Sequence, residues 1–281
     1  MHIDAHQHFW RYDPAEYGWI DESMSALKRD FVPADLEPLM QAAGFHACVA
    51  VQARQTIRET YWLLDLAIEY PFIAGVVGWV NLQSPNVERD LEMFAGRRRL
   101  VGIRHIVQSE PDDFMLRPAF QRGLEALERF NLAYDILIYP RHLEAAATLV
   151  SRFPSQRFVL DHAAKPEIRN GEIERWREGL RRLAQFPNVC CKLSGLVTEA
   201  DWRDWTPEQV RPYIEVAAEC FGPRRLMIGS DWPVCTVAAP YERAMTVVTD
   251  AIASWTADER AAVLGGTAAR FWNLRTQEIT T

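Results

Sequence analysis

The sequence predicts an α/β protein built as one (β/α)₈ barrel over residues 1–281. Short apolar and β-branched runs recur along the chain, and most of them precede a stretch with helical periodicity. The runs at residues 158–160 and 189–191 are almost continuously apolar, as expected of parallel strands that are covered on both faces. The length of 281 residues suits one barrel, which needs roughly 250 residues. Two smaller domains would also fit that length.

Eight strands are expected in chain order. Each is an apolar run bounded by polar residues, Gly or Pro. Eight strands with helical crossovers favour a closed barrel over an open doubly wound sheet, and no strand is followed by a G-x-G-x-x-G turn. The strands are expected at Ile3 to His6, Ala47 to Ala53, Ile73 to Asn81, Val101 to Val107, Ala133 to Ile138, Phe158 to His162, Val189 to Leu193 and Leu226 to Gly229.

Helices are expected between these strands. Within residues 141–153, Leu143, Ala146, Ala147 and Val150 follow the i, i+3, i+4, i+7 spacing of one buried helix face. The same periodicity predicts the other helices at residues 34–43, 57–70, 87–95, 119–130, 173–186, 207–221 and 241–253.

The charge balance and the termini narrow the class of protein. The chain has 31 Lys and Arg against 38 Asp and Glu, and its net charge of -7 disfavours binding to nucleic acid or to anionic membranes. The N-terminus lacks the regions of a signal peptide, and no apolar run approaches the roughly 18 residues of a membrane span. The five cysteines have no C-x-x-C spacing. We expect a cytoplasmic protein that acts on a small molecule, and the sequence leaves a homo-oligomer open.

Two connections are long, residues 9–33 after the first strand and residues 194–206 after the seventh. Loops that follow barrel strands lie at the C-terminal face, where substrate sites form. Long ordered loops in compact domains are often functional, although these two could simply cover the barrel.

Candidate metal ligands begin at the first strand. His6 and His8 are two residues apart, so both rings point to the same side of the strand. Two neutral imidazoles at a strand end could form half of a mononuclear zinc or manganese site. The pair alone is a weak signal, since both rings could instead donate structural hydrogen bonds.

Asp231 ends the eighth strand, which lies beside the first strand once the barrel closes. A carboxylate buried there needs a partner. It could act as the general base that accepts a proton from water, coordinate a metal, or do both. The alternative is a helix N-cap or a salt-bridged turn residue.

Other strand ends also carry polar side chains. His162 ends the sixth strand, Arg104 and His105 end the fourth, and Lys192 ends the seventh, where a buried cation needs a negative partner or a ligand. Singly, each could be structural, but together these strand ends indicate a site.

Indole faces can stack on sugar rings, and the tryptophans near strand ends or in the first loop are Trp10, Trp19, Trp79 and Trp232.

These residues resemble the amidohydrolase superfamily, in particular its branch of sugar lactonases and 2-pyrone-4,6-dicarboxylate lactonase. The resemblance spans essentially the whole chain. It is carried by residues 4–8 (Asp-Ala-His-Gln-His), His162, residues 229–233 (Gly-Ser-Asp-Trp-Pro) and residues 266–272 (Gly-Thr-Ala-Ala-Arg-Phe-Trp). It implies a distorted amidohydrolase-type barrel that hydrolyses an aldonolactone such as L-fucono- or L-rhamnonolactone.

The resemblance also implies roles for individual residues. Asp231 would activate water and His162 would assist in catalysis. One divalent metal, zinc before others, would be held by His6, His8, His162 and Asp231, although the branch also contains metal-free proteins. Independently of the resemblance, their positions near strand ends make Arg104, His105, Lys192, Trp10 and Trp232 the candidate substrate-binding residues. A binuclear centre is not expected, because residues 104–105 and 138–139 replace the carboxylated lysine and the histidine that such centres use.

The expected function is therefore general-base hydrolysis of a sugar lactone, within sugar catabolism. Three rivals stay open: a zinc-dependent decarboxylase of an aromatic or unsaturated acid on the same barrel, a cyclic-amide hydrolase, and a non-catalytic carbohydrate-binding barrel. Release of CO₂ would identify the first rival, and tight sugar binding without hydrolysis would identify the last.

Overall fold

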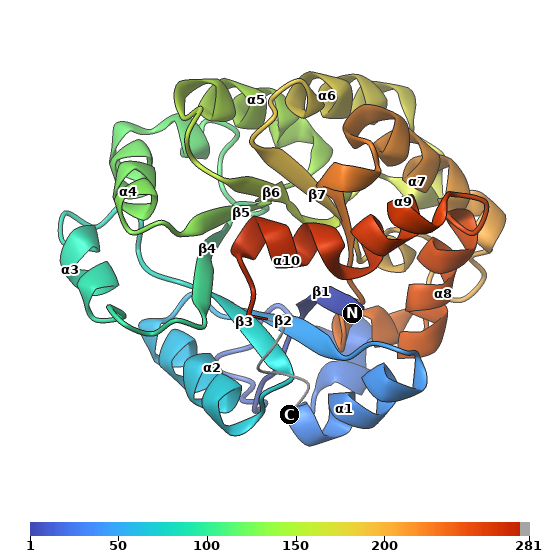
Figure 1. The fold of residues 1–281 in the computed structure, drawn as a ribbon, viewed down its shortest axis with the longest axis horizontal. Helices are drawn as coiled ribbons and strands as arrows, with labels where there is room; N and C mark the ends of the chain where they lie inside the picture. The colour runs from blue at the N-terminus through green and yellow to red at the C-terminus, as the bar shows by residue number, and fades with distance from the viewer. Residues whose placement is uncertain (276–281) are drawn as a thin grey trace.

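The structure of the chain is a computed structural model that describes residues 1–275, and it confirms the predicted barrel. Residues 276–281, the end of the predicted domain, lie outside the described residues. The strands are all parallel, and each pairs with its neighbours in sequence (Figure 1). They are β1 (Ile3–Gln7), β2 (Ala47–Val51), β3 (Ile73–Gly78), β4 (Leu100–Ile106), β5 (Ala133–Leu137), β6 (Phe158–Leu160), β7 (Val189–Leu193) and β8 (Leu226–Ile228).

Helices surround the strands as the periodicity predicts (Figure 1). In the crossovers and after β8 they are α1 (Pro33–Ala42), α2 (Ile57–Glu69), α3 (Val87–Glu92), α4 (Pro118–Arg129), α5 (Leu143–Arg152), α6 (Glu174–Ala184), α7 (Pro207–Phe221) and α8 (Tyr241–Ala251). The helices α9 (Ala257–Ala261) and α10 (Thr267–Trp272) were not predicted from the periodicity. No helix within residues 1–275 is long and apolar enough to span a membrane.

Strands β1 and β8 close the barrel through hydrogen bonds just beyond β8. The backbone N–H of Asp231 donates to the carbonyl of His6 at 2.8 Å, and the N–H of His8 donates to the carbonyl of Trp232 at 2.6 Å. Gln7 and Trp232 form a parallel bridge. Closure therefore brings the predicted base next to the predicted histidine pair.

The carboxylate of Asp4 reinforces this closure from the buried outer side of β1. It accepts hydrogen bonds from the backbone N–H of Ser230 at 2.9 Å, from the Ser230 hydroxyl at 2.6 Å and from the Tyr241 hydroxyl at 3.2 Å. Asp4 and Ser230 are both buried. This side chain therefore ties β1 to the turn that carries Asp231.

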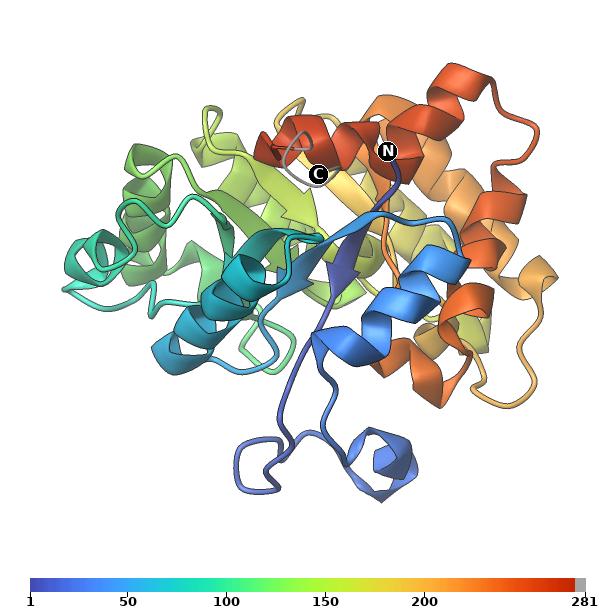
Figure 2. The ribbon, with the colours of Figure 1, turned by 60° about the horizontal axis from the view of Figure 1, so that its bottom comes forward.

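The apolar core has two parts. One lies between the strands and the surrounding helices, and the other fills the barrel interior. The interior part contains small residues such as Ala5 and Ala133, and it is covered by Phe271 and Trp272 of α10. Figure 2 shows α10 and the N-terminus at one end of the barrel, while the loop after β1 projects from the other end. The end of the barrel opposite α10 is therefore the one that can carry a functional site.

A buried carboxylate ties the loop after β2 to α2. Glu59 accepts hydrogen bonds from the backbone N–H groups of Ala53 at 3.1 Å and Arg54 at 2.7 Å. Arg54 also pairs with Glu16 of the first loop. Burial raises the pKa of Glu59 to about 7, although the two N–H donors and Arg54 oppose the shift. Folding therefore favours the protonated form of Glu59.

We expect Trp272→Ala to lower the free energy of unfolding by about 3–5 kcal/mol, because it empties the centre of the apolar layer under the barrel. Ile68→Ala on α2 is the control, since Ile68 is 67% exposed and should change stability by less than about 0.5 kcal/mol. Denaturant unfolding followed by far-ultraviolet circular dichroism measures both. Similar, small effects for the two variants would contradict the role given to α10.

We expect Glu59→Gln to become more stable relative to the unmodified chain as the pH rises from 5 to 8. A carboxyl group whose pKa is raised from 4.5 to about 7 by folding stabilises the chain fully below pH 4.5, and this contribution is lost as the pH rises through 7. The difference should reach at most about 3 kcal/mol. Thermal unfolding of both proteins across this range measures it, and a pH-independent difference would contradict the shift.

Candidate active site

Three imidazoles and one carboxylate meet at the C-terminal end of the barrel. Asp231 Oδ1 lies 3.3 Å from His8 Nε2, 3.8 Å from His6 Nε2 and 3.9 Å from His162 Nε2. The Nε2 atoms of His6 and His8 are 3.2 Å apart. All four side chains are at most 6% exposed. The structure thus brings together the four residues that the sequence analysis named as a metal and catalytic set.

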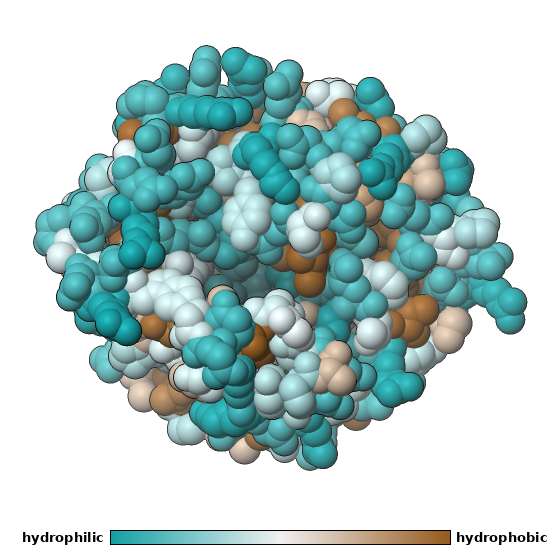
Figure 3. All heavy atoms as spheres, turned by 180° about the vertical axis from the view of Figure 1, so that it is seen from behind, coloured by the Kyte–Doolittle hydropathy of each residue, from teal (hydrophilic) through white to brown (hydrophobic). Residues whose placement is uncertain are grey.

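The same face of the molecule is hollowed at its centre. Figure 3 shows the side opposite to α10, where mostly hydrophilic residues surround a depression in the middle of the face. The loop after β1, which rises at this end, is closed at its base by paired backbone hydrogen bonds of 2.9 Å between Trp10 and Phe31. The depression therefore lies where a barrel enzyme presents its site.

Unusual backbone conformations aim two of the four side chains. Residues 162–165 all have positive φ values between 49° and 63°, and Asp231 has a φ of 58°. L-residues adopt this region with strain, and such strain is found preferentially at functional sites. The indole N–H of Trp176 donates to the carbonyl of Ala163 at 2.7 Å, which holds the strained turn after β6 in place.

Each imidazole uses its Nδ1 atom for a partner within the protein. His8 Nδ1 lies 2.8 Å from the carbonyl oxygen of Val51, so this nitrogen carries the proton and donates it. His162 Nδ1 lies 2.9 Å from the Ser194 hydroxyl oxygen. Both rings turn their Nε2 atoms toward Asp231, and in His8 this nitrogen carries the lone pair.

His6 is surrounded by charged groups. Its Nδ1 lies 3.5 Å from Asp161 Oδ1 and 3.1 Å from Lys192 Nζ, and its Nε2 lies 3.3 Å from a guanidinium nitrogen of Arg104. Lys192 and Arg104 can only donate and Asp161 can only accept, so these contacts are compatible with the hydrogen on either ring nitrogen. Burial and the nearby Lys192 ammonium hold the pKa of His6 well below its usual value, so the ring is neutral.

The donor set fits one divalent metal ion. Ligand atoms of His6, His8 and Asp231 lie within 4.8 Å of one another, as do those of His6, Asp161 and His162. Burial lowers the pKa of His162 to about 4, although the charge of Asp231 opposes the shift. Neutral imidazole nitrogens with a carboxylate oxygen are ligands that zinc prefers. A zinc ion on the Nε2 atoms would have its ligands oriented by the Nδ1 contacts.

Asp231 is ionised in this environment. Burial by itself would raise the pKa of its carboxyl group, but the facing imidazoles of His162, His8 and His6 hold the pKa well below its usual range. Oδ2 lies on the side of Gly195, where a Cβ atom would be only 2.9 Å away. The carboxylate is therefore able to accept a proton or to bind a cation.

Arg104 and Lys192 belong to an ion-pair network inside the barrel. Lys192 Nζ lies 2.5 Å from Asp135 Oδ2 and 2.8 Å from Asp161 Oδ1, and Arg104 lies 3.1 Å from Asp161 Oδ2. The structure confirms that buried Lys192 needs a negative partner. That Arg104 and Lys192 hold substrate stays a prediction, since the partners of their hydrogen bonds and ion pairs are carboxylates, His6 and Gln52.

Sequence reasoning missed the two carboxylates of this network. Asp135 is the one charged residue in the apolar run 133–138, and Asp161 directly precedes His162. A charge inside an apolar strand was the signal available for Asp135, since such a residue on an interior position requires an opposite charge.

His105 does not face the site. It neighbours Arg104 on β4, so the alternation of side chains directs it away from the barrel interior. Its ring stacks on Phe114 with centroids 4.8 Å apart, and its Nε2 lies 3.2 Å from Glu110. The predicted substrate role of His105 therefore has no support from this structure.

Two of the predicted aromatic ligands are also buried by protein. Trp10 has no exposed surface, and its indole N–H donates to the carbonyl of Arg29 at 2.9 Å. Trp232 is 2% exposed and packs against Phe9 and Phe31. Since neither indole face is open, the prediction that they stack on a sugar has no support from this structure.

The other two tryptophans are more accessible. Trp19 in the first loop is 41% exposed. Trp79, just after β3, is partly buried, and its indole N–H lies 3.4 Å from His105 Nδ1. The structure thus leaves a stacking role open for these two alone among the four predicted tryptophans.

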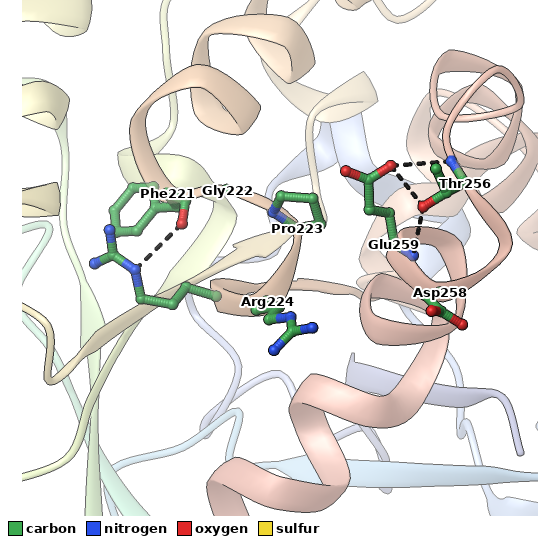
Figure 4. Close-up of a pocket in the computed structure, with 8 residues that line it drawn as sticks. Phe221, Gly222, Pro223, Arg224, Thr256, Asp258 and Glu259 are labelled. Atoms are coloured by element: carbon green, nitrogen blue, oxygen red, sulfur yellow. Dashed lines mark hydrogen bonds between the residues drawn. The ribbon is translucent and has the colours of Figure 1, made fainter.

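A second cavity of about 510 Å³ lies away from these residues (Figure 4). It is formed by the loop that precedes β8 and by the start of α9, so it sits at the N-terminal end of the barrel. Its carboxylate Glu259 already accepts hydrogen bonds from the backbone and hydroxyl of Thr256. The lining includes none of the four clustered residues, and this cavity is not the candidate site.

The chain is similar to proteins of known class over nearly its whole length. Residues 3–274 match the family model described as Amidohydrolase. An L-fucono-1,5-lactonase of Burkholderia multivorans is 42% identical, and the match covers 98% of this chain and 96% of that protein. An L-fucono-1,5-lactonase of Burkholderia ambifaria is 38% identical, with 97% and 95% covered.

A solved structure shows the same fold. The crystal structure of an amidohydrolase from Burkholderia multivorans with bound zinc superposes with a TM-score of 0.95 at 42% sequence identity, and the match covers 98% of this chain and 99% of that one. That structure contains zinc, and the present chain clusters three imidazoles with a carboxylate.

We expect Ser194→Ala to weaken zinc binding by about 10- to 100-fold, because it removes the hydrogen-bond partner of His162 Nδ1 and frees the ring to rotate. Competition with a chromophoric chelator, starting from metal-free protein, measures the affinity. Ser151→Ala on α5 is the control, since its hydroxyl bonds only to a carbonyl of the same helix. Equal zinc affinities for Ser194→Ala and the unmodified chain would contradict the ligand role of His162.

Proposed function

Because the chain belongs to the amidohydrolase family, we propose that it is a lactonase that hydrolyses the ring ester of a sugar-acid lactone. The single observation that carries the proposal is the Asp231 carboxylate facing three histidines at the open end of the barrel. Two relatives that match nearly the whole chain are named as L-fucono-1,5-lactonases. A six-membered L-fuconolactone ring is accordingly the substrate that we propose.

Asp231 acts as the general base in this mechanism. Its carboxylate accepts a proton from the water that attacks the lactone carbonyl, and its low pKa keeps it ready for that step at neutral pH. The backbone N–H bond to the His6 carbonyl fixes the carboxylate beside the histidines. The attack produces a tetrahedral oxyanion. When it collapses, the bond between the carbonyl carbon and the ring oxygen breaks, and that oxygen takes the proton from Asp231 to give the free sugar acid.

His6, His8, His162 and Asp231 would hold one zinc ion. When bound, zinc supplies a Lewis acid that polarises the ester carbonyl and stabilises negative charge on its oxygen. The protein orients these ligands through Val51, Ser194 and Asp161. The low exposure of the cluster limits competing water, which strengthens the electrostatic interactions in the site.

The rivals of this proposal have less support. A decarboxylase would use the same cluster, but the relatives at 42% and 38% identity are both named as lactonases. A non-catalytic binding barrel would not need an ionised carboxylate aimed at three imidazoles.

The cellular setting is also part of the proposal. The five cysteines are free, which is usual in the reducing cytoplasm, and we place the enzyme there. Its partner is a small lactone rather than nucleic acid, in keeping with the net charge of -7.

We expect the purified protein to release acid from L-fucono-1,5-lactone in a pH-indicator assay, and Asp231→Asn to lower kcat by at least about 100-fold. The amide keeps the shape of the side chain but cannot accept the proton. Metal content is quantified, and samples treated with chelator and resupplied with zinc are compared.

Each outcome decides one part of the proposal. Acid release by correctly folded protein establishes the lactonase, and its loss on chelation with recovery by zinc assigns the histidines as ligands. A variant that keeps more than a tenth of the wild-type kcat would exclude Asp231 as the base. No hydrolysis of any aldono-1,4- or 1,5-lactone, together with release of CO₂ from an unsaturated or aromatic acid, would favour the decarboxylase.

A further inference from the structure

An ion pair that the mechanism does not use lies beside the catalytic cluster. Lys165 Nζ is 2.5 Å from Glu199 Oε1, and the side chains are 15% and 18% exposed. Lys165 ends the left-handed turn that begins at His162, and Glu199 lies in the loop after β7. Both therefore come from loops at the C-terminal end of the barrel.

The loop that carries Glu199 lies directly against the reacting groups. At Gly195, with a φ of +60°, a Cβ atom would be 2.7 Å from His162 Nδ1 and 2.9 Å from Asp231 Oδ2. The hydroxyl of Thr198 donates to the carbonyl of Gly195 at 2.6 Å, which folds the loop into a compact turn. Only glycine allows this close approach, and the turn delivers Glu199 to Lys165.

Lys165 is the one lysine placed to meet a ligand at this end. Lys192 is fully buried within the barrel network, and Lys28 pairs with Glu22 inside the first loop. Lys165 lies three residues after His162 in the same left-handed turn, and its partner Glu199 follows the segment at Gly195 that lies against His162 and Asp231. Its bond to Glu199 occupies one of its three N–H groups, so donors remain.

We propose that Lys165 and Glu199 bind the hydroxyl groups of the sugar lactone and so select polyhydroxylated lactones over unsubstituted ones. The inference rests on the proposed lactonase function. An ammonium group offers donors and a carboxylate offers acceptors, and a sugar hydroxyl can use both at once. The His6, His8, His162 and Asp231 cluster acts on the ester, while this pair acts on the rest of the ring.

The division of labour predicts a substrate-dependent effect. δ-Valerolactone has the same six-membered ester ring as L-fucono-1,5-lactone but no hydroxyl groups. Lys165→Met and Glu199→Gln should each lower kcat/KM for the sugar lactone by about 10- to 100-fold, mainly through KM. The same variants should hydrolyse δ-valerolactone within about threefold of the unmodified enzyme, because the ester machinery is intact.

Lys28→Met is the matched control, since it breaks a pair with the same 2.5 Å contact within the first loop. It should leave both activities unchanged. Thermal unfolding of all variants reports on folding. Equal losses on the two lactones, or no loss on the sugar lactone, would overturn the inference while leaving the lactonase function in place.

A direct binding measurement separates this inference from the proposed function. If the unmodified protein hydrolysed no lactone, the lactonase function would fail. Calorimetric titration with L-fuconate, the ring-opened acid, then decides the inference. Binding that weakens about tenfold or more in Lys165→Met and Glu199→Gln supports a hydroxyl-binding pair, and binding that is equal in all proteins, or absent from the unmodified one, overturns it.

Discussion

Closure of the barrel between β1 and β8 is the constraint on which the whole site depends. His6 and Asp231 lie near opposite ends of the chain, and one backbone hydrogen bond of 2.8 Å joins them. Asp4, buried on the other side of β1, accepts bonds from Ser230 and Tyr241 only when the strands are adjacent. An open sheet would leave this carboxylate with the backbone N–H of His6 as its remaining donor, which is unfavourable for a buried charge. The fold and the catalytic cluster are therefore formed by the same contacts.

The charges inside the barrel explain why the cluster can bind a ligand. Arg104 and Lys192 are balanced by Asp135 and Asp161, so these buried groups cancel one another. Asp231 is an additional buried carboxylate outside this network, and it faces the imidazoles of His6, His8 and His162. A buried carboxylate outside an ion-pair network is costly to a fold and useful in a site. The imbalance suits a divalent cation, which the imidazole nitrogens can coordinate together with the carboxylate.

Residue patterns alone predicted the strands closely because a parallel barrel strand is apolar on both faces and ends abruptly at its loop. The same logic placed His6, His8, His162 and Asp231 at strand ends, and closure of the barrel brings these four side chains together. The sequence could not show the direction of a side chain where that direction depends on packing. His105 differs from Arg104 by one position and faces the opposite side of β4. Trp10 is buried by the first loop, and no local pattern in the sequence shows that this loop packs over it.

Backbone strain in the described residues is concentrated at the site. Apart from Asn131 and Asn273, of a residue type that tolerates left-handed conformations, the non-glycine residues with positive φ are residues 162–165 and Asp231. Each costs roughly 1–2 kcal/mol, so the fold gives up several kcal/mol at the ends of β6 and β8. The left-handed turn keeps both residues at the mouth, one against Ser194 and Asp231 and the other against Glu199. The core must offset the strain at these positions. This cost has a functional reason if both side chains contact the same ligand, His162 at its ester group and Lys165 at its hydroxyl groups.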